Sequence, residues 1–373
     1  MKPPKTHRRI ALAISLLGVL CVNFSPAATN EFPLLDLPQP NGPYAIGTRI
    51  LVLQDTSRKR DLVVTAWFPA EVGAAVAPYM DPRTAAELAR EWKLRPGFER
   101  CVRPHAWLDA KIIHDGHFPV VLLEHGSGVV PALYTVLAEG LASEGYIVVA
   151  TNHPPDSLIA VYPDGHEVKS APYWPADADR RTQGIAIGKF AADVLVADVR
   201  FVLDQFQELN SHDEFWHDHL DFSKVGIVGH SMGGTTAALA TLEEKRIRAG
   251  VNLDGSTYPG MNGDIRPIPL HKPLLFIATE EHASDPETHA KEYVGSKFDT
   301  YYLVVAGSDH MGFTDARLIQ NRFSLEPASE GPTTEHALAT LKLTISMAEE
   351  FLGKYLKGNP APELDALVRI DRK

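Results

Sequence analysis

Cysteine is nearly absent from the 373-residue sequence, which excludes a disulfide framework. The chain has 2 cysteines, Cys21 and Cys101, and Cys21 lies in an N-terminal segment that we expect to be removed. With one remaining thiol, the protein has no internal disulfide and must draw its stability from a hydrophobic core. No helix start or nucleophile-bearing turn surrounds Cys101, so a buried, unreactive thiol is favoured over a catalytic one.

Long apolar runs are also lacking, which argues against a membrane-spanning helix. The most extended run, Ile10–Val22, covers 13 residues and is too short for a comfortable span. Basic residues precede it, and small residues such as Ser25 and Ala27 follow it. This pattern predicts a signal peptide over residues 1–27, cleaved near Ala27, although an uncleaved anchor would have the same residues. We therefore expect an exported protein, periplasmic or secreted.

Positive charge is in the minority. The chain has 36 Lys and Arg against 47 Asp and Glu, a formal net charge of −11. Removal of residues 1–27 would take away four basic and no acidic residues and bring the charge to −15. This excess of negative charge argues against nucleic acid or an anionic membrane surface as an electrostatic partner. The 45% hydrophobic and 22% charged residues are typical of a globular protein with an ample core.

Apolar strand patterns alternate with helical patterns along most of the chain, without internal repeats. A proline-rich, extended lead-in occupies residues 28–43, and the runs at 48–53 and 62–68 predict an N-terminal antiparallel hairpin. Residues 76–116 interrupt the rhythm and show no strand period. They are expected to be an insertion over one face, either a lid or acyl-pocket wall, or ordinary surface packing. The stretch 152–178 is expected to be irregular, and a long helix is predicted from about residue 185 to 209. The whole of residues 44–373 is predicted to be one α/β domain with a doubly wound, mostly parallel sheet.

A strand-to-helix turn with a central serine is the strongest motif. Residues 224–234 read Lys-Val-Gly-Ile-Val-Gly-His-Ser-Met-Gly-Gly. An apolar run that ends in Gly-x-Ser-x-Gly and continues into helix-forming residues predicts a nucleophile elbow, whose strained turn presents the serine hydroxyl. Gly229 and Gly233 suit this turn because strand and helix pack closely there. The sequence thus predicts an α/β-hydrolase fold with Ser231 as nucleophile.

Polar residues follow three other predicted strands. They are His125-Gly-Ser-Gly, Asp254 and the His310 of Gly-Ser-Asp-His. The carboxyl ends of parallel strands meet at one edge of a sheet, so we expect these residues to approach Ser231. A serine hydroxyl needs a base to accept its proton, and the base needs a carboxylate to fix its tautomer. A triad of Ser231, Asp254 and His310 follows in the chain order expected for this fold.

Other residues are also candidates for the acid of the predicted triad. Many α/β-hydrolases take it after the next strand, where this chain offers Glu280, Glu281 and Asp285. We prefer Asp254 because it follows its strand directly.

These motifs together resemble the plasma-type platelet-activating factor acetylhydrolases and their bacterial relatives. The likeness covers most of residues 44–357, including Gly-His-Ser-Met-Gly-Gly, Leu-Asp254 and Gly-Ser-Asp-His310-Met-Gly-Phe-Thr-Asp. The resemblance implies the same triad, and it implies that main-chain N–H groups of Ser127 and Met232 form the oxyanion hole. Ser127 stands where the animal enzymes carry a bulky apolar residue, and Met232 where they carry an aromatic one. We therefore expect the acyl pocket to have its own shape.

The expected function is a serine esterase that acts through an acyl-enzyme and needs no metal or cofactor. The resemblance implies phospholipids with short or oxidised sn-2 acyl chains, and with them transient contact with a lipid surface. A cutinase-like polyester hydrolase or a broad carboxylesterase is the runner-up within the same chemistry, and such enzymes usually take the acid after the later strand. A non-catalytic binding module on a hydrolase fold is the alternative from another class. The sequence leaves the natural ester and the oligomeric state open.

Other histidines have structural interpretations. The segment 212–219 carries three histidines among acidic residues, but it lies in the connection before the elbow strand, where a solvated loop is favoured over a metal site. His125 is expected to fix the turn of residues 125–128, which carry Ser127 and are called the oxyanion loop below. His230 is expected to shape the pocket while pointing away from Ser231.

Overall fold

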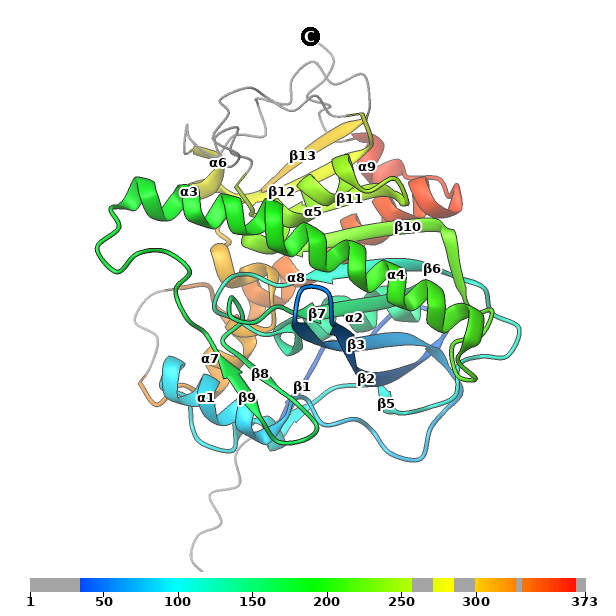
Figure 1. Ribbon diagram of the computed structural model, residues 1–373, viewed down its shortest axis with the longest axis horizontal. Coiled ribbons are helices and arrows are strands. Elements are labelled where there is room, and N and C mark those ends of the chain that lie inside the picture. Colours follow the sequence, from blue (N-terminus) through cyan, green and yellow to red (C-terminus); the bar gives the residue numbers. More distant parts are fainter. Residues whose placement is uncertain (1–33, 257–270, 285–298, 327–330, 367–373) are drawn as a thin grey trace, which may run out of the picture. The chain divides into compact units, whose positions relative to one another are not determined.

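A nine-stranded sheet forms the centre of the computed structural model, which describes residues 34–256, 271–284, 299–326 and 331–366 (Figure 1). Its order is β13-β12-β11-β10-β6-β7-β3-β2-β5, and neighbours run parallel except for the pairs β2–β3 and β3–β7. In that order the strands are Thr300–Val305, Leu274–Thr279, Ile247–Leu253, Leu220–His230, Phe118–Glu124, Ile147–Asn152, Arg60–Ala70, Ala45–Asp55 and Trp107–Leu108. The predicted mostly parallel sheet with its N-terminal antiparallel hairpin is confirmed.

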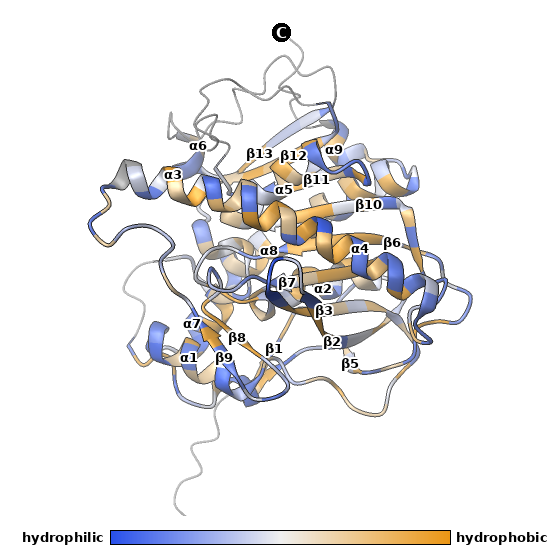
Figure 2. Cartoon of the chain, in the orientation of Figure 1, coloured by the Kyte–Doolittle hydropathy of each residue, from blue (hydrophilic) through white to orange (hydrophobic). Residues whose placement is uncertain are grey.

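Helices cover both faces of this sheet, which explains the uninterrupted apolar sequence of its central strands. Every residue of β6 is buried. In Figure 1, α4 (Val196–His212) and α5 (Met232–Glu243) lie in front of the sheet, and α2 (Thr135–Ser143) and α8 (Thr334–Leu352) lie behind it. Figure 2 shows hydrophobic residues along the central strands and hydrophilic residues on the outer sides of helices and in loops.

The described residues form further helices and two small sheets. The other helices are α1 (Pro82–Trp92), α3 (Arg180–Phe190), α6 (Glu280–Ser284), α7 (Ala316–Phe323), α9 (Pro362–Ala366), the π-helical η3 (Ala191–Leu195) and η7 (Gly353–Lys357), and the 3₁₀ turns η1 (Phe98–Cys101), η2 (Pro131–Tyr134) and η6 (His310–Phe313). Two small sheets pair β1 (Leu35–Asp36) with β4 (Val102–Arg103) and β8 (Ile159–Val161) with β9 (Glu167–Lys169).

Three features differ from the sequence-based expectations. The helix expected from about residue 185 to 209 runs from Arg180 to His212 as α3, η3 and α4, with a π turn in its middle. The stretch between β7 and α3, expected to be irregular, contains the β8–β9 hairpin. The segment 76–116, expected to lack strands, contributes β4 and the edge strand β5 beside β2. Two- and three-residue strands are too short to produce a readable period in sequence.

The predicted signal peptide lies outside the described residues and stays a prediction. Within the described part of the chain, no helix has both the length and the apolar character needed to cross a membrane.

Candidate active site

Ser231 occupies a strained turn between β10 and α5. Its backbone has φ 56° and ψ −121°, in a region that a non-glycine residue enters at a cost of about 1–3 kcal/mol. The turn is held because the Ser231 N–H donates to the carbonyl of Leu253 at 2.8 Å and the Ser231 carbonyl accepts from Thr235 N–H at 3.1 Å. A Cβ on Gly229 would lie 2.0 Å from the carbonyl oxygen of Gly233. Strand and helix therefore touch through their backbones, as the predicted elbow requires.

Asp254 and His310 come together next to this turn. Each follows a strand of the parallel part of the sheet, Asp254 after β11 and His310 after β13. His310 Nδ1–H donates to Asp254 Oδ2 at 2.7 Å. The other carboxylate oxygen, Oδ1, accepts the main-chain N–H of Thr279 at 2.7 Å and its hydroxyl at 3.1 Å. In the neutral imidazole this bond places the proton on Nδ1, so Nε2 is the nitrogen that can accept a proton.

The charge of Asp254 results from two opposed effects. The residue is 3% exposed, and burial raises the pKa of a carboxyl group. The hydrogen bonds from His310 and from the Thr279 main chain outweigh burial and lower the pKa of Asp254 below its usual value. The group is therefore a carboxylate at neutral pH.

The competing acids do not share this position. Glu280 Oε2 accepts the main-chain N–H of Gly307 at 3.1 Å, and both Glu280 and Glu281 are exposed. Asp285 lies outside the described residues. Among the described carboxylates, Asp254 is the one bonded to His310.

The loop after β6 passes directly against Ser231. A Cβ on Gly126 would lie 3.2 Å from the Cβ of Ser231. The Ser127 hydroxyl donates to Asp156 Oδ1 at 2.6 Å, and the Gly128 N–H donates to the carbonyl of Asp156 at 2.8 Å. Asp156 thus holds the loop at Ser127 and at Gly128, directly after the Ser127 amide.

Met232 supplies the other predicted oxyanion donor. It is the first residue of α5, and the first N–H groups of a helix have no acceptor within it. Its N–H also lies at the positive end of the helix dipole, which favours a developing oxyanion.

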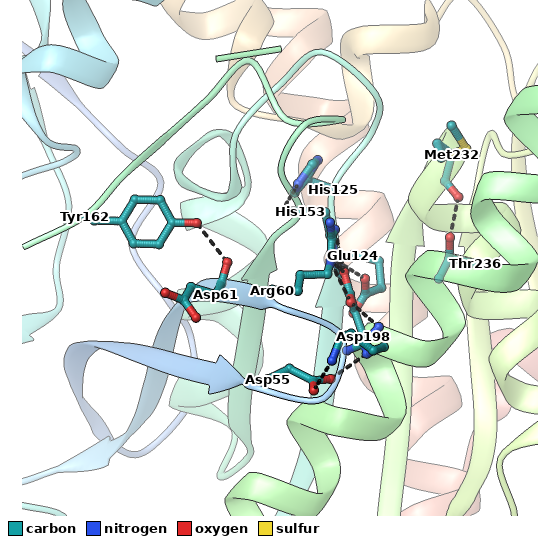
Figure 3. A network of polar contacts seen from close by, with 11 residues as sticks. Asp55, Arg60, Asp61, Glu124, His125, His153, Tyr162, Asp198, Met232 and Thr236 are labelled. Atoms are coloured by element: carbon teal, nitrogen blue, oxygen red, sulfur yellow. Dashed lines mark hydrogen bonds and ion pairs between the residues drawn. The ribbon is translucent and has the colours of Figure 1, made fainter. Parts of the chain in front are cut away.

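A buried network of charged side chains lies beneath the oxyanion loop (Figure 3). His153 lies between Glu124, whose Oε2 is 2.6 Å from Nε2, and Asp198, whose Oδ2 is 2.9 Å from Nδ1. Arg58 and Arg60 also donate to Asp198. Burial disfavours the imidazolium, but Glu124 and Asp198 outweigh it and raise the pKa of His153 to about 9. The ring is therefore positively charged at neutral pH.

His125 connects this network to the oxyanion loop. Its Nε2 accepts the main-chain N–H of His153 at 3.2 Å, so its Nδ1 carries the proton and lies 2.7 Å from the carbonyl oxygen of Gly126. Burial, and then the charge of His153, lower the pKa of His125 to about 3. These bonds agree with the expected role of His125 in the loop turn. The charged network itself was missed, since its members are scattered between residues 55 and 198.

The discounted residues lie apart from this arrangement. His212 is 3.7 Å from Glu208, and His217 is 3.5 Å from Asp218. The described residues contain no group of three or more His, Cys, Asp or Glu that could hold a metal ion. Cys101 is half-buried in η1 rather than fully buried as expected.

A cavity of about 420 Å³ lies elsewhere, between the insertion 76–116 and the hairpin strands β2 and β3. Residues after the oxyanion loop, such as Val130 and Thr135, also line it, whereas Ser231, Asp254 and His310 do not.

Comparison with known proteins decides the family. The family model for platelet-activating factor acetylhydrolase, isoform II, matches residues 91–176 and 185–361, more than half of the chain. The chain belongs to this family. The platelet-activating factor acetylhydrolase of Cavia porcellus is 27% identical over 311 residues, which are 75% of this chain and 69% of the relative. That of Canis lupus familiaris is 26% identical over 369 residues, 84% of this chain and 80% of the relative.

A similar solved structure also belongs to an esterase. The ferulic acid esterase from Streptomyces cinnamoneus superposes with a TM-score of 0.72 at 28% identity, covering 88% of this chain and 95% of the esterase. This member of the platelet-activating factor acetylhydrolase family is therefore a carboxylic ester hydrolase with an α/β-hydrolase fold. The fold, family and enzyme class expected from the sequence are confirmed.

Proposed function

We propose that the protein hydrolyses phospholipids with short or oxidised sn-2 acyl chains through an acyl-enzyme on Ser231. The observation that carries the proposal is the 2.7 Å bond from His310 to a buried Asp254 beside the strained Ser231 turn. The names of the relatives support the substrate class. They include a probable 1-alkyl-2-acetylglycerophosphocholine esterase of Arthroderma benhamiae, 24% identical over 288 residues, 67% of this chain and 68% of the relative.

In the proposed mechanism, Ser231 Oγ bonds to the ester carbonyl carbon while its proton passes to His310 Nε2. The carbonyl oxygen becomes an oxyanion that accepts the main-chain N–H groups of Ser127 and Met232. Removal of one such donor typically costs about 10²–10³ in rate. When the bond to the alcohol breaks, His310 gives the leaving oxygen its proton. The same imidazole then deprotonates the water that attacks the acyl carbon, and it returns this proton to Ser231 Oγ when the bond between Oγ and the acyl carbon breaks and the acid leaves. Asp254 stabilises the imidazolium in both steps.

A specific observation favours esters of aromatic acids as a second candidate. The ring of Tyr173 stacks on Phe190 at 4.1 Å and meets Trp174 edge-on at 4.9 Å. The Tyr173 hydroxyl donates at 3.2 Å to the same Asp156 oxygen that holds Ser127. Aromatic rings therefore lie one side chain away from a proposed oxyanion donor. The structural similarity to a ferulic acid esterase supports this candidate.

A substrate panel separates the candidates. We would measure kcat/KM for 1-alkyl-2-acetylglycerophosphocholine, p-nitrophenyl acetate and methyl ferulate. Preference for the lipid over the equally short soluble acetate supports the main proposal. Preference for methyl ferulate supports the candidate with an aromatic acyl group. A preference for p-nitrophenyl acetate contradicts both and supports a broad carboxylesterase.

Variants test the residues. Ser231→Ala should lower kcat by about 10⁴-fold or more, whereas Ser223→Ala, an exposed serine on the same strand β10, should leave it unchanged. Undiminished hydrolysis by Ser231→Ala would contradict the mechanism.

Asp254→Asn should lower kcat by about 10⁴-fold because no carboxylate then fixes the tautomer of the His310 ring. Asp285→Asn should cost little, and the opposite result would reassign the acid.

We also propose that residues 1–27 direct export and are removed near Ala27. Basic residues before an apolar run and small residues after it support this. N-terminal sequencing of the protein recovered from the periplasm or the medium tests it, and an intact Met1 would contradict cleavage.

A further inference from the structure

His230 and Tyr134 form a buried link between two parts of the proposed site that lie far apart in sequence. We infer that they are positioning residues, which hold the His310 loop and the oxyanion loop in the arrangement that ester hydrolysis requires. The inference rests on the proposed function, because it assigns a role to residues around the triad.

The link consists of three short hydrogen bonds. His230 Nε2 lies 2.7 Å from the carbonyl oxygen of His310. Its other ring nitrogen, Nδ1, lies 2.9 Å from the hydroxyl of Tyr134. The same hydroxyl oxygen lies 2.9 Å from the main-chain nitrogen of Gly126. His230 and Tyr134 are each 1% exposed.

The donors and acceptors in this link can point only one way. The Gly126 N–H must donate, so the Tyr134 oxygen accepts it and the Tyr134 O–H is left to donate to His230 Nδ1. His230 then carries its proton on Nε2, which donates to the His310 carbonyl, a group that can only accept. Burial, and then the proximity of His310, lower the pKa of His230 to about 3. The ring is therefore neutral, with one tautomer, throughout the neutral pH range.

The link holds His310, the member of the predicted triad whose side chain is widely exposed. The His310 side chain is 48% exposed, so packing alone does not fix its position. The rings of His230 and His310 are 4.6 Å apart, and the hydrogen bond holds the His310 main chain at the end of β10. A Cβ on Gly126 would lie 3.2 Å from His230 Nδ1, so the oxyanion loop packs on the same ring. The residue before the nucleophile thus contacts both other parts of the site.

Two substitutions divide the link into halves. The amide of asparagine takes the place of Nδ1 and that of glutamine the place of Nε2. His230→Asn therefore keeps the Tyr134 contact and loses the His310 carbonyl, whereas His230→Gln does the reverse. Tyr134→Phe keeps the ring and releases Gly126. We expect kcat to fall by about 10–100-fold in His230→Asn and about 10-fold in Tyr134→Phe and His230→Gln, with KM within about twofold, because misplaced groups weaken transition-state contacts selectively.

A second readout separates positioning from stability. A boronic acid that forms a tetrahedral adduct on Ser231 should bind each variant more weakly by the same factor that kcat falls. The double variant His230→Asn/Tyr134→Phe should lose less than the product of the single losses, because both substitutions break one link.

Matched controls lie outside the link. His219, at the other end of β10, donates through Nδ1 to the Gly116 carbonyl at 3.0 Å, and the Tyr162 hydroxyl donates to the Asp61 carbonyl at 2.8 Å. His219→Gln and Tyr162→Phe should leave kcat and inhibitor binding unchanged. Folded His230→Asn and Tyr134→Phe with wild-type kcat would overturn the inference while leaving the Ser231 mechanism intact. An active Ser231→Ala would instead overturn the proposed function itself.

Discussion

Two buried histidines near the same edge of the sheet differ in charge, one being positive and the other neutral. His153 follows β7 and His230 ends β10, and each is 1% exposed. His153 contacts two carboxylates and has a pKa of about 9, whereas His230 contacts a phenol and a carbonyl group and has a pKa of about 3. Burial alone would have made both rings neutral. The neighbouring groups, rather than the depth of burial, determine which ring carries a second proton and is positively charged.

The two rings also support the oxyanion loop differently. His153 reaches it through a main-chain bond to His125, and its charge is balanced by carboxylates deeper in the fold. His230 reaches it through Tyr134 and also bonds to the His310 loop. We therefore expect changes at His153 to affect mainly stability and changes at His230 to affect mainly turnover.

The largest expected effect is on stability. His153→Gln leaves Glu124 and Asp198 without the positive charge between them. Removal of one partner from a buried ion pair typically costs about 3–5 kcal/mol, so the free energy of unfolding should fall by this amount in urea at pH 7. His230→Gln, which loses one neutral hydrogen bond, should cost about 1 kcal/mol. Equal losses in the two variants would contradict the charge difference.

The pH dependence of stability should differ in sign. The pKa of His153 is raised on folding, so its contribution is complete below about pH 6.5 and is lost as the pH rises through about 9. The pKa of His230 is lowered, so its contribution is complete above about pH 6.5 and is lost as the pH falls toward 3.

Difference curves isolate these two contributions. Urea unfolding of wild type, His153→Gln and His230→Gln from pH 4 to 10 provides them, because the titrations of Glu349 and Lys357 cancel in each difference. A stability difference for His153→Gln that stays constant between pH 6.5 and 9 would show that this ring is not charged.

A smaller effect concerns the cations around Asp198. Arg60 donates to both oxygens of Asp198, at 2.9 and 2.8 Å. Arg60→Met should cost about 2 kcal/mol, the usual contribution of hydrogen bonds to a charged group. It should also raise the pKa of His153 further, because one neighbouring positive charge is gone. NMR titration of the His153 ring measures this shift, and Arg83→Met, in an exposed pair with Asp81, should leave it unchanged.

The smallest expected effect is that of Ser127→Ala. The Ser127 hydroxyl donates to Asp156, which the Tyr173 hydroxyl also contacts, and the proposed oxyanion donor is the Ser127 amide. Loss of this hydrogen bond, at about 1 kcal/mol, corresponds to about a fivefold fall in kcat. A fall above about 100-fold, measured with p-nitrophenyl acetate, would mean that the hydroxyl itself contacts the substrate.

The architecture and the positions around the predicted triad could be read from the sequence because they follow local rules. Gly-His-Ser-Met-Gly predicts the elbow, and buried parallel strands appear as apolar runs that end in polar loops. Since such loops share one edge, the proximity of Asp254 and His310 follows from topology. The roles of Ser231, Asp254, His310, Ser127 and Met232 in catalysis stay predictions until the variants are assayed.

The two histidine networks could not be read from the sequence. His153 and Asp198 are 45 residues apart, and His230 and His310 are 80 apart. Their contacts depend on how loops and helices pack, for which no spacing rule exists. A buried glutamate at the end of an apolar strand, such as Glu124, was the one available signal, since a charge in that position needs a partner.

The π turn of η3 sets the direction in which the side chains of α3 point relative to those of α4. Each residue of an α-helix advances the side-chain direction by about 100°, so the extra residue in Ala191–Leu195 rotates α3 by that angle relative to α4. Asp198 can thus face the buried charges while Phe190 stacks on Tyr173. An insertion or deletion at this one turn would move Phe190 relative to Tyr173 without disturbing the contacts of Asp198.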